Sequence, residues 1–289
     1  MKTHLTLLGA LGLAAGLPAQ APLSPRAGAT RFDSVLEVFH SGRSDVGEGT
    51  RRLGEMATSS FRANTVVAVA GDAQDRFLVG AGGQWLDFEA PAASLVPTRL
   101  HSLALKLGWN RTFDPQWSLR LEVDPGIYGE GSFGAPLAVR AIYARSRELQ
   151  WAFGVNYDWR SGTPLIGGVG VRWQFAPDWT LAFLVPAPRL EWAATRNLSL
   201  TCGASLRGGT FRVADDFGRT RGRPAFDGQT VDYREITIGI GARWHLTPGT
   251  ALALAVGATT DRRFHFEDRD LLLNGNGAPA AQLTLTSAF

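Results

Sequence analysis

The sequence is short of sulfur and of long apolar runs, and each shortage excludes a class of protein. Its 289 residues include one cysteine and two methionines. The single Cys202 excludes an intramolecular disulfide and a zinc site built from cysteines. Beyond the N-terminal segment, no stretch offers 18 consecutive apolar residues, so the sequence predicts no helical membrane span.

Charge is also sparse, at 19% of residues, with a net charge of +3 and no run of one sign. No basic stripe with interleaved aromatics occurs, so we expect no nucleic-acid partner. Glycine and aromatics are plentiful instead, with 34 Gly, 9 Trp and 16 Phe. This composition is typical of a membrane barrel, where small residues fit a curved wall and rings lie at the lipid boundary. A secreted β-sandwich can share it.

The N-terminus has the features of an export signal. Lys2 and His4 precede an apolar run over residues 5–16, which is too short to cross a bilayer. An A-x-A cleavage pattern follows, and cleavage is expected after Ala19 or Ala21. We therefore predict a signal peptide over 1–21, a periplasmic lead-in over 22–31 and one barrel domain over 32–289.

The dominant pattern after this segment has a period of two, as in a β-strand. Between residues 101 and 111, Leu103, Leu105, Leu107 and Trp109 share one face, and polar or small residues share the other. Strands of a soluble sandwich also alternate, but they usually run about five or six residues. Several runs here reach the roughly 9–11 residues that a tilted transmembrane strand needs. Tryptophans lie near their ends, where an aromatic girdle is expected.

These runs predict an all-β chain that forms a single antiparallel transmembrane β-barrel of 12–14 strands. The expected strands are 32–41, 60–70, 77–88, 100–111, 117–125, 137–145, 149–159, 165–175, 179–185, 189–194, 198–212, 234–245, 250–262 and 280–289. Short connections alternate with long ones, such as 42–59, 213–233 and 263–279. This rhythm is typical of short periplasmic turns and long outer loops, with both termini in the periplasm. Fourteen strands is the count that fits; twelve is the alternative, because prolines interrupt residues 184–194.

The last strand ends in a pattern that resembles the signal read by the bacterial barrel-assembly machinery. Leu283, Leu285 and Phe289 share one face, and Phe289 is the final residue. Ser287 departs from the pattern, since a bulky apolar residue is commoner there. We expect the assembly machinery and outer-membrane lipid to be partners of this chain.

Several further motifs resemble a family of uncharacterised bacterial outer-membrane β-barrels, known as a domain of unknown function. They are Asp158-Trp159, the segment 164–168, Pro177-Asp178-Trp179, the segment 186–189, Tyr233-Arg234 and the segment 263–267. The resemblance covers roughly residues 60–289. It implies the barrel fold and the outer membrane, and it implies no activity.

Charged residues on the second face of the strands are expected to point into the barrel, because an Arg or Lys facing lipid at midplane costs about 2–4 kcal/mol. The candidate lumen-lining residues are Lys106, Arg120, Glu122, Asp124, Arg140, Asn156, Asp158, Arg172, Arg207, Glu235 and Arg243. Two interpretations remain open. The charges form a pairing network that fills the barrel, or they line a passage or binding site for polar solutes.

The leading hypothesis for function is passive passage or binding of small polar solutes. The alternative is a structural or adhesive surface protein that acts through outer loops 213–233 and 263–279. A lipid-modifying barrel enzyme is third. His101, His245 and His265 lie near strand ends, but no Gly-x-Ser-x-Gly motif or catalytic triad pattern accompanies them, so we do not expect an enzyme. No pattern indicates a cofactor or a metal site.

Overall fold

The computed structural model describes residues 32–288 except 73, 93 and 186. The predicted signal peptide, the lead-in and Phe289 lie outside the described residues. The strands are β1 (Phe32–Glu48), β2 (Arg51–Gly71), β3 (Asp75–Glu89), β4 (Arg99–Thr112), β5 (Trp117–Val123), β6 (Gly126–Tyr128), β7 (Phe133–Gly134), β8 (Leu137–Ala144), β9 (Leu149–Tyr157), β10 (Leu165–Ala176), β11 (Trp179–Leu184), β12 (Arg189–Ala193), β13 (Leu198–Arg212), β14 (Thr230–Thr247), β15 (Thr250–Phe266), β16 (Leu271–Gly275) and β17 (Ala278–Ala288). Three short 3₁₀ turns are η1 (Arg219–Arg221), η2 (Pro224–Phe226) and η3 (Glu267–Arg269).

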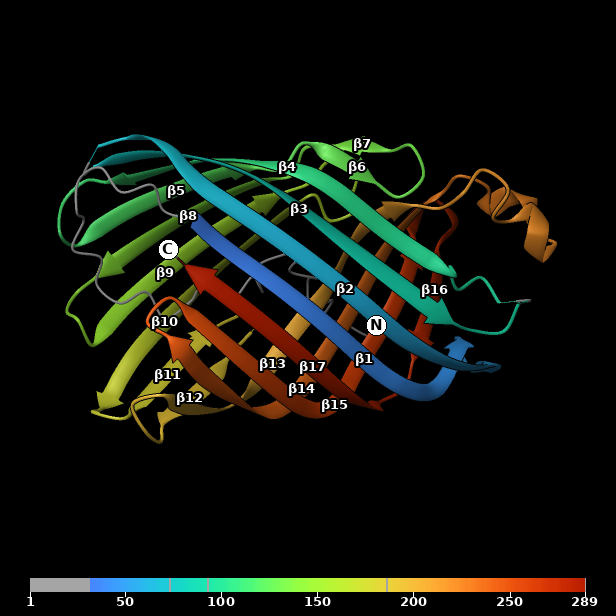
Figure 1. Cartoon of the computed structure of the whole chain (residues 1–289). Helices are drawn as coiled ribbons and strands as arrows, with labels where there is room; N and C mark the ends of the chain where they lie inside the picture. The colour runs from blue at the N-terminus through green and yellow to red at the C-terminus, as the bar shows by residue number, and fades with distance from the viewer. Residues whose placement is uncertain (1–31, 73, 93, 186, 289) are drawn as a thin grey trace, which may run out of the picture.

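Fourteen of these strands form one closed antiparallel barrel (Figure 1). Each pairs with its neighbours in chain order, and β17 closes the ring by pairing with β1 from Ala288↔Asp33 to Ala280↔Ser41. The remaining strands β6, β7 and β16 are short additions at one end. The predicted single antiparallel barrel is confirmed, and its count is fourteen. No helix among the described residues is long and apolar enough to cross a bilayer.

The outer surface carries a continuous apolar band. On β14, Ile238, Ile240 and Trp244 are exposed on the outward face, while Gly239 and Gly241 alternate with them. The band on this strand runs from Ile236 to Trp244, and nine residues of a tilted strand rise about 25 Å, the height of the apolar zone of a transmembrane barrel. These exposed side chains explain why the alternation in the sequence is so regular: each strand has one face for lipid.

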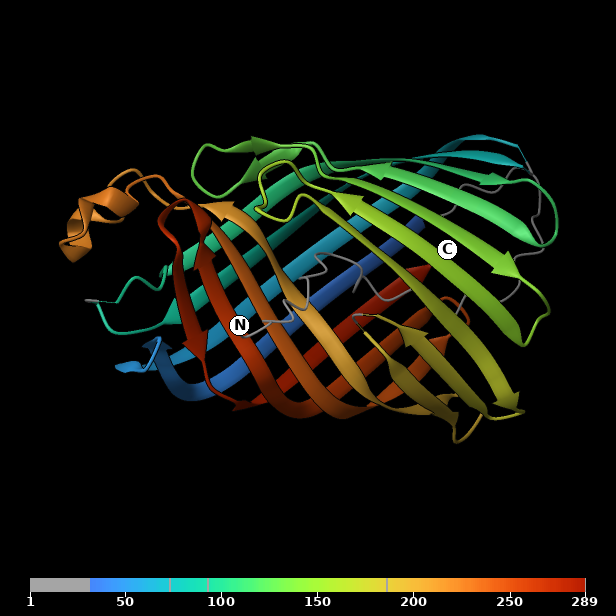
Figure 2. The ribbon, with the colours of Figure 1, turned by 180° about the vertical axis from the view of Figure 1, so that it is seen from behind.

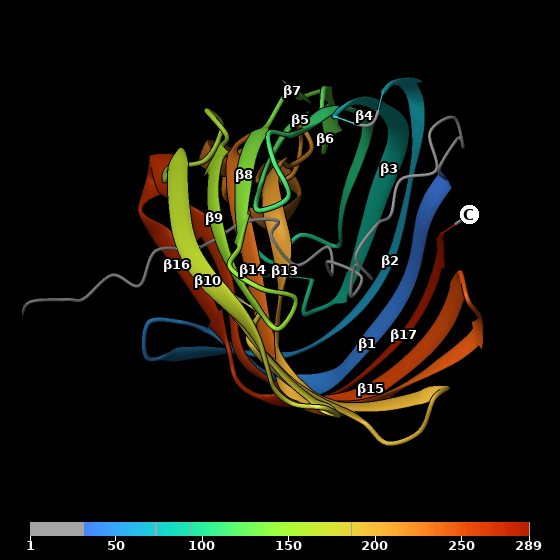
Figure 3. The same ribbon diagram turned by 90° about the vertical axis from the view of Figure 1, so that its left-hand side faces the viewer.

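One end of the barrel carries the short turns, and we call it the short-turn end (Figure 3). The start of β1 and the end of β17 lie there (Figure 1). Aromatic side chains cluster where the apolar band meets the short-turn end. There Trp179 stacks on Trp192 with ring centroids 5.8 Å apart, and the ring centroids of Trp117 and Tyr143 are 4.9 Å apart. The other members of this girdle are Phe77, Trp109, Trp151, Trp173, Phe175 and Trp244.

The wall has two unequal parts. We call β1–β4 and β13–β17 the tall half, because its barrel strands are long, and β5 with β8–β12 the short half. The segments 42–59 and 263–279, expected to be long loops, are mostly strand: β1 and β2 continue to a turn at residues 49–50, and β15 and β16 form a second hairpin. The expectation failed because these segments lie beyond the apolar band, where the outward face is polar and the lipid pattern stops.

The tall half closes on a hydrophobic core at the opposite end, which we call the long-hairpin end. Phe88, Tyr233 and Phe264 form its centre, with ring centroids 4.8–5.0 Å apart. The segment 213–233 was expected to be an outer loop, but its last residues belong to β14 and its first part packs Phe217 and Phe226 onto Phe266. This outer core also contains Val46, Met56, Leu86, Leu95, Val96, Leu100, Phe211, Val213, Val231, Leu271 and Leu273.

Candidate functional site: the barrel interior and its cap

The interior of the tall half is filled by ion pairs that cross from wall to wall. Arg207 on β13 pairs with Glu37 on β1 at 2.8 Å, although β14, β15 and β17 separate these strands in the sheet. The guanidinium of Arg207 also lies 3.5 Å from the ring centroid of Phe39. The side chains of Arg207 and Glu37 are only 4% and 11% exposed. This layer therefore ties opposite walls together.

A second buried pair lies beside it. Arg262 and Glu235 are 3.2 Å apart and both side chains are fully buried. Ser41 accepts a hydrogen bond from Arg262, and the Tyr233 hydroxyl donates to Glu235. Such neighbours are required, because a buried ion pair repays its desolvation cost only when its remaining polar groups are bonded. Two of the sequence candidates, Arg207 and Glu235, thus face the interior, where each belongs to a buried ion pair.

The interior from β4 into the short half is charged and partly exposed. Lys106 on β4 pairs with Asp124 at 2.7 Å. Glu122 on β5 accepts from both Arg120 and Arg140. These five side chains, all sequence candidates, are 20–32% exposed, far more than the pairs of the tall half. Water therefore reaches them, as expected of side chains that line a lumen.

A row of arginines continues this charged surface around the wall. Arg172 on β10 and Arg189 on β12 both lie in register with Ala182 of β11. Arg189 also interacts electrostatically with Glu191 and with Arg243 on β14. Arg172 and Arg243 were predicted from the sequence, whereas Arg189 and Glu191 were not. Arg189 and Glu191 alternate with the exposed Trp192, and this alternation is the sequence signal for inward-facing side chains. The strand β12 is too short for the pattern to be clear.

Two segments extend beyond the short half toward the tall half, and we call them the cap: residues 126–134, in which β6 pairs with both β4 and β7, and residues 158–164. Arg160 joins them. Its guanidinium pairs with Asp158 at 2.6 Å, lies 3.8 Å from the ring centroid of Tyr128, and donates to the carbonyl of Thr210 on β13 at 3.3 Å. The side chain of Arg160 is 8% exposed. One buried cation therefore contacts both cap segments and β13, in addition to the pairing of β6 with β4.

Further contacts dock the cap on the outside of β13–β15. Ser161 donates to Asp232 at 3.1 Å, and the Thr210 hydroxyl donates to the same carboxyl group. Gly162 lies against Glu267, where a Cβ would collide with the carboxylate. Two sequence candidates adjoin this region: Asp158 belongs to the cap, and Asn156 on β9 faces inward beneath it.

The cap also shifts the protonation of the two carboxyl groups it covers. Burial raises the pKa of Asp232, and nearby Asp158 adds to the shift, while hydrogen bonds from Thr210, Ser161 and Gly162 oppose it. Burial likewise raises the pKa of Glu267, with Asp232 as the next contributor. Both groups lie beyond the apolar band. Docking therefore favours their protonated forms.

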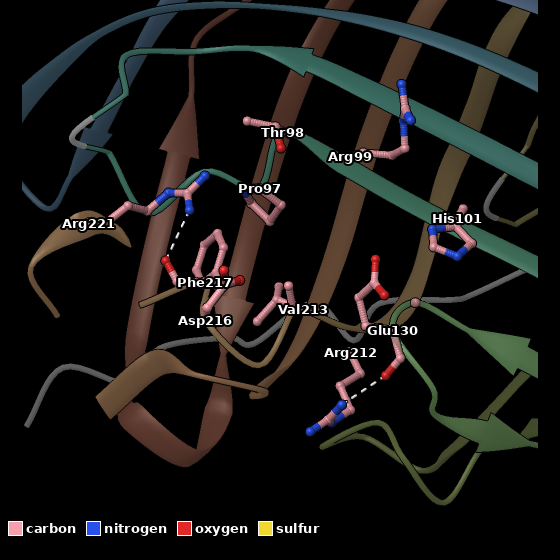
Figure 4. Close-up of a pocket in the computed structure, with 12 residues that line it drawn as sticks. Pro97, Thr98, Arg99, His101, Glu130, Arg212, Val213, Asp216, Phe217 and Arg221 are labelled. Carbon is pink, nitrogen blue, oxygen red and sulfur yellow. Dashed lines mark hydrogen bonds between the residues drawn. The ribbon is translucent and has the colours of Figure 1, made fainter. Parts of the chain in front are cut away.

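The cap segment 126–134 contacts the tall half beside a small pocket of about 180 Å³ (Figure 4). Glu130 N–H donates to the carbonyl of Arg212 at 3.0 Å, and the Arg212 guanidinium donates to the carbonyl of Glu130 at 2.8 Å. Arg221, on the pocket's far side, donates to the carbonyls of Ser94 and Phe217. The arginines of the pocket are thus engaged in holding the loops together.

The histidines do not assemble a catalytic group in the described part of the chain. His265 Nδ1 lies 3.6 Å from Glu267 Oε1, which is longer than a hydrogen bond. Among the described residues, no cluster of three or more His, Cys, Asp or Glu side chains is arranged to hold a metal ion. At the chain end, Leu283 of the predicted assembly signal is exposed on the outer face, and Phe289 lies outside the described residues.

The apolar band outside, the charges inside and the closed ring of strands define a transmembrane β-barrel of the outer-membrane type. Within that class, the chain belongs to the family described as a domain of unknown function (DUF6268), whose sequence profile matches residues 77–274. No curated protein matches the sequence.

Solved structures share the fold at very low sequence identity. The deltaS2S3 mutant of the TodX monoaromatic hydrocarbon channel has a TM-score of 0.51 at 10% identity, over 94% of this chain and 93% of that one. The deltaS2 mutant of the same channel gives 0.50 at 10% identity with the same coverage. A FadL homologue from Pseudomonas aeruginosa gives 0.49 at 9% identity, over 90% of each chain.

Proposed function

We propose that this protein is a passive channel of the bacterial outer membrane that passes small polar solutes, with a preference for anions. The observation that carries the proposal is the partly exposed charged interior from β4 into the short half, which lies inside a wall whose outer face is apolar. Water-accessible charges in a lumen select among solutes by their charge. The structures with TM-scores of 0.50 and 0.51 are both forms of a channel, which agrees with this role.

The anion preference comes from the balance of lumen charge. Cations predominate in the short half and in the adjoining arginine row. They are Lys106, Arg120, Arg140, Arg172, Arg189 and Arg243, and the facing carboxylates are Asp124, Glu122 and Glu191. Fixed positive charge in a confined passage raises the local concentration of anions.

Orientation follows from the lengths of the connections. We propose that the short-turn end, with the start of β1 and the end of β17, faces the periplasm, as in other outer-membrane barrels. The long-hairpin end then faces the exterior. Because the outer core fills the tall half, solutes pass through the short half, and the cap must move to admit them.

Ion selectivity in planar bilayers tests the proposal. In a KCl gradient, the reversal potential of the wild-type channel is expected to have the sign of chloride preference. Arg172→Glu with Arg243→Glu should move it toward potassium preference. Arg43→Glu is the matched control, because Arg43 is an exposed side chain outside the lumen, 3.6 Å from Glu89. An unchanged reversal potential in the double variant would contradict the proposed path.

A further inference from the structure

Between β10 and β13, the described residues form no strand pairing over the upper part of the barrel wall. The last pair between β10 and β11 is Gly170↔Leu184, so residues 165–169 of β10 extend beyond it. The last pair between β12 and β13 is Arg189↔Gly203, followed by one further hydrogen bond from Ala204 N–H to Pro188. From there β10 and β13 separate above the short β11–β12 hairpin (Figure 2). We call this interval the wall break.

Proline explains why the hairpin stops early. Pro188 lies directly before β12 and has no N–H to extend the ladder. Ala187 N–H turns back to the carbonyl of Leu184 at 2.7 Å, which ends the hairpin there. Above this point, the contacts that the described cap residues make with β13 lie close to the end of that strand: the bridge Gly129↔Arg212 and the hydrogen bond from Arg160 to the carbonyl of Thr210.

The wall break begins within the apolar band and not above it. On β10, Gly167 and Val169 pair with Val155 and Phe153, which are exposed apolar residues of the band. On β13, Ala204 pairs with Ile238 of the band. Strand edges exposed to hydrocarbon cost several kcal/mol for each unpaired backbone group, and transmembrane barrels normally leave none. A break at this depth therefore carries a free-energy cost, and we expect it to serve a function.

The rim of the wall break is apolar outside and has space inside. Leu165 and Val169 are 63% and 56% exposed on the outward face, and Phe183 and Val185 line the hairpin side. Gly168 lies on the opposite, inward face of β10. It is exposed, whereas Ile166 and Gly170 on that inward face are buried. A Cβ at Gly168 would meet only the carbonyl of Val185, at 3.9 Å. The sequence thus leaves room beside the break.

We propose that the wall break is a side passage between the lumen and the half of the bilayer nearer the long hairpins, and that it takes small apolar solutes. This rests on the proposed function, because the solute enters the lumen through the same cap. An apolar solute gains free energy by leaving water for hydrocarbon, at about 25 cal/mol per Å² of apolar surface. Polar solutes gain nothing there and continue along the axis to the periplasm.

Glycines 167 and 168 provide a matched pair of variants for the test. Gly168→Trp places a ring at the inner side of the wall break, where there is space. Gly167→Trp places the same ring on the lipid-facing side, where the nearest atoms are 3.5 Å or more from the Cβ position. Gly168→Leu is a smaller version of the first change. Heat-modifiable gel mobility confirms that each variant is a folded barrel.

The readout is uptake of the apolar dye N-phenyl-1-naphthylamine by Gram-negative cells that express the full chain, together with conductance of the purified protein in KCl. We expect wild type and Gly167→Trp to take up dye faster than cells without the protein. Gly168→Trp should fall to the rate of those cells, Gly168→Leu should lie between, and both should retain conductance. Equal dye uptake in Gly168→Trp and wild type, or no excess uptake in wild type, overturns the side passage. Absent conductance in every variant overturns the proposed function instead.

Discussion

The guanidinium of Arg160 lies 3.8 Å from the ring centroid of Tyr128, so two loops that are distant in sequence share one buried contact. The same guanidinium reaches the carbonyl of Thr210 on the tall half at 3.3 Å. This side chain is therefore one of the contacts that join the two halves, together with the Ser161–Asp232 and Glu130–Arg212 hydrogen bonds. If the cap is the barrier to passage, Arg160 controls how often it opens.

Removing this side chain should open the channel more often. Arg160→Ala deletes the hydrogen bond to Thr210 and the contact with Tyr128. Loss of a charged hydrogen bond of about 2 kcal/mol lowers the ratio of docked to undocked cap roughly thirtyfold. We expect a higher open probability in single-channel recordings, with unchanged unit conductance. Arg160→Lys keeps the charge but not the fork of donors, and should lie between. An open probability equal to that of wild type would show that the cap does not gate the lumen.

Locking the cap should have the opposite effect. Gly162 lies against the carboxyl group of Glu267, so Gly162→Cys with Glu267→Cys places two thiols close enough to oxidise, in a Cys202→Ser background. Oxidation should suppress the current and a reductant should restore it. The control is Ser34→Cys with Ser287→Cys, a cross-strand pair of β1 and β17 remote from the cap. Current that survives complete oxidation would contradict the gating role.

Acid should close the channel. The docked cap raises the pKa of Asp232 above its ordinary value of 3.8 by burial, and undocking removes the part of that burial which the cap supplies. The docked state therefore binds protons more tightly, and docking strengthens as pH falls from neutrality through the raised pKa toward the undocked pKa. Glu267 shifts in the same direction. We expect open probability to decline with acidity.

The matched variant is Asp232→Asn, which imitates the protonated carboxyl group at every pH. It should show low open probability at neutral pH and a weaker pH dependence, with the remainder due to Glu267. A wild-type channel that opens more readily in acid would reverse the sign and exclude this mechanism.

The cross-barrel pair should be important for stability. Glu37→Ala leaves Arg207 buried without its carboxylate, and loss of one partner of a buried pair costs roughly 3–5 kcal/mol. Asp87→Ala is the control, because the Arg99–Asp87 pair is exposed and such pairs contribute about 0–1 kcal/mol. Reversible urea unfolding in detergent or lipid measures both. Equal, small losses of unfolding free energy in the two variants would mean that the buried Arg207–Glu37 pair does not hold the walls together.

The sequence was informative wherever one strand face meets lipid. Alternation of apolar and polar residues placed all fourteen barrel strands, with ends close to those observed within the band. It failed above the band, where β1, β2 and β15 continue with a polar outer face and an inner face packed in the outer core. There the partner of each residue lies on another hairpin, and a local pattern carries no information about it.

The interior was only partly predictable for the same reason. Alternation shows that Arg207 and Glu235 point inward, but not that Glu37 and Arg262 meet them from other strands. Nor does it show that Arg160, in a loop, joins three elements. Pairing across a barrel depends on its cross-section, which is set by all the strands together.

Swelling of proteoliposomes in solutions of small polar solutes tests passive passage most directly. Liposomes that contain the folded chain should swell faster than protein-free liposomes, the rate should fall as solute size increases, and Arg160→Ala should raise it. Swelling no faster than in protein-free liposomes, for both wild type and Arg160→Ala and with strand content intact by circular dichroism, would contradict a channel.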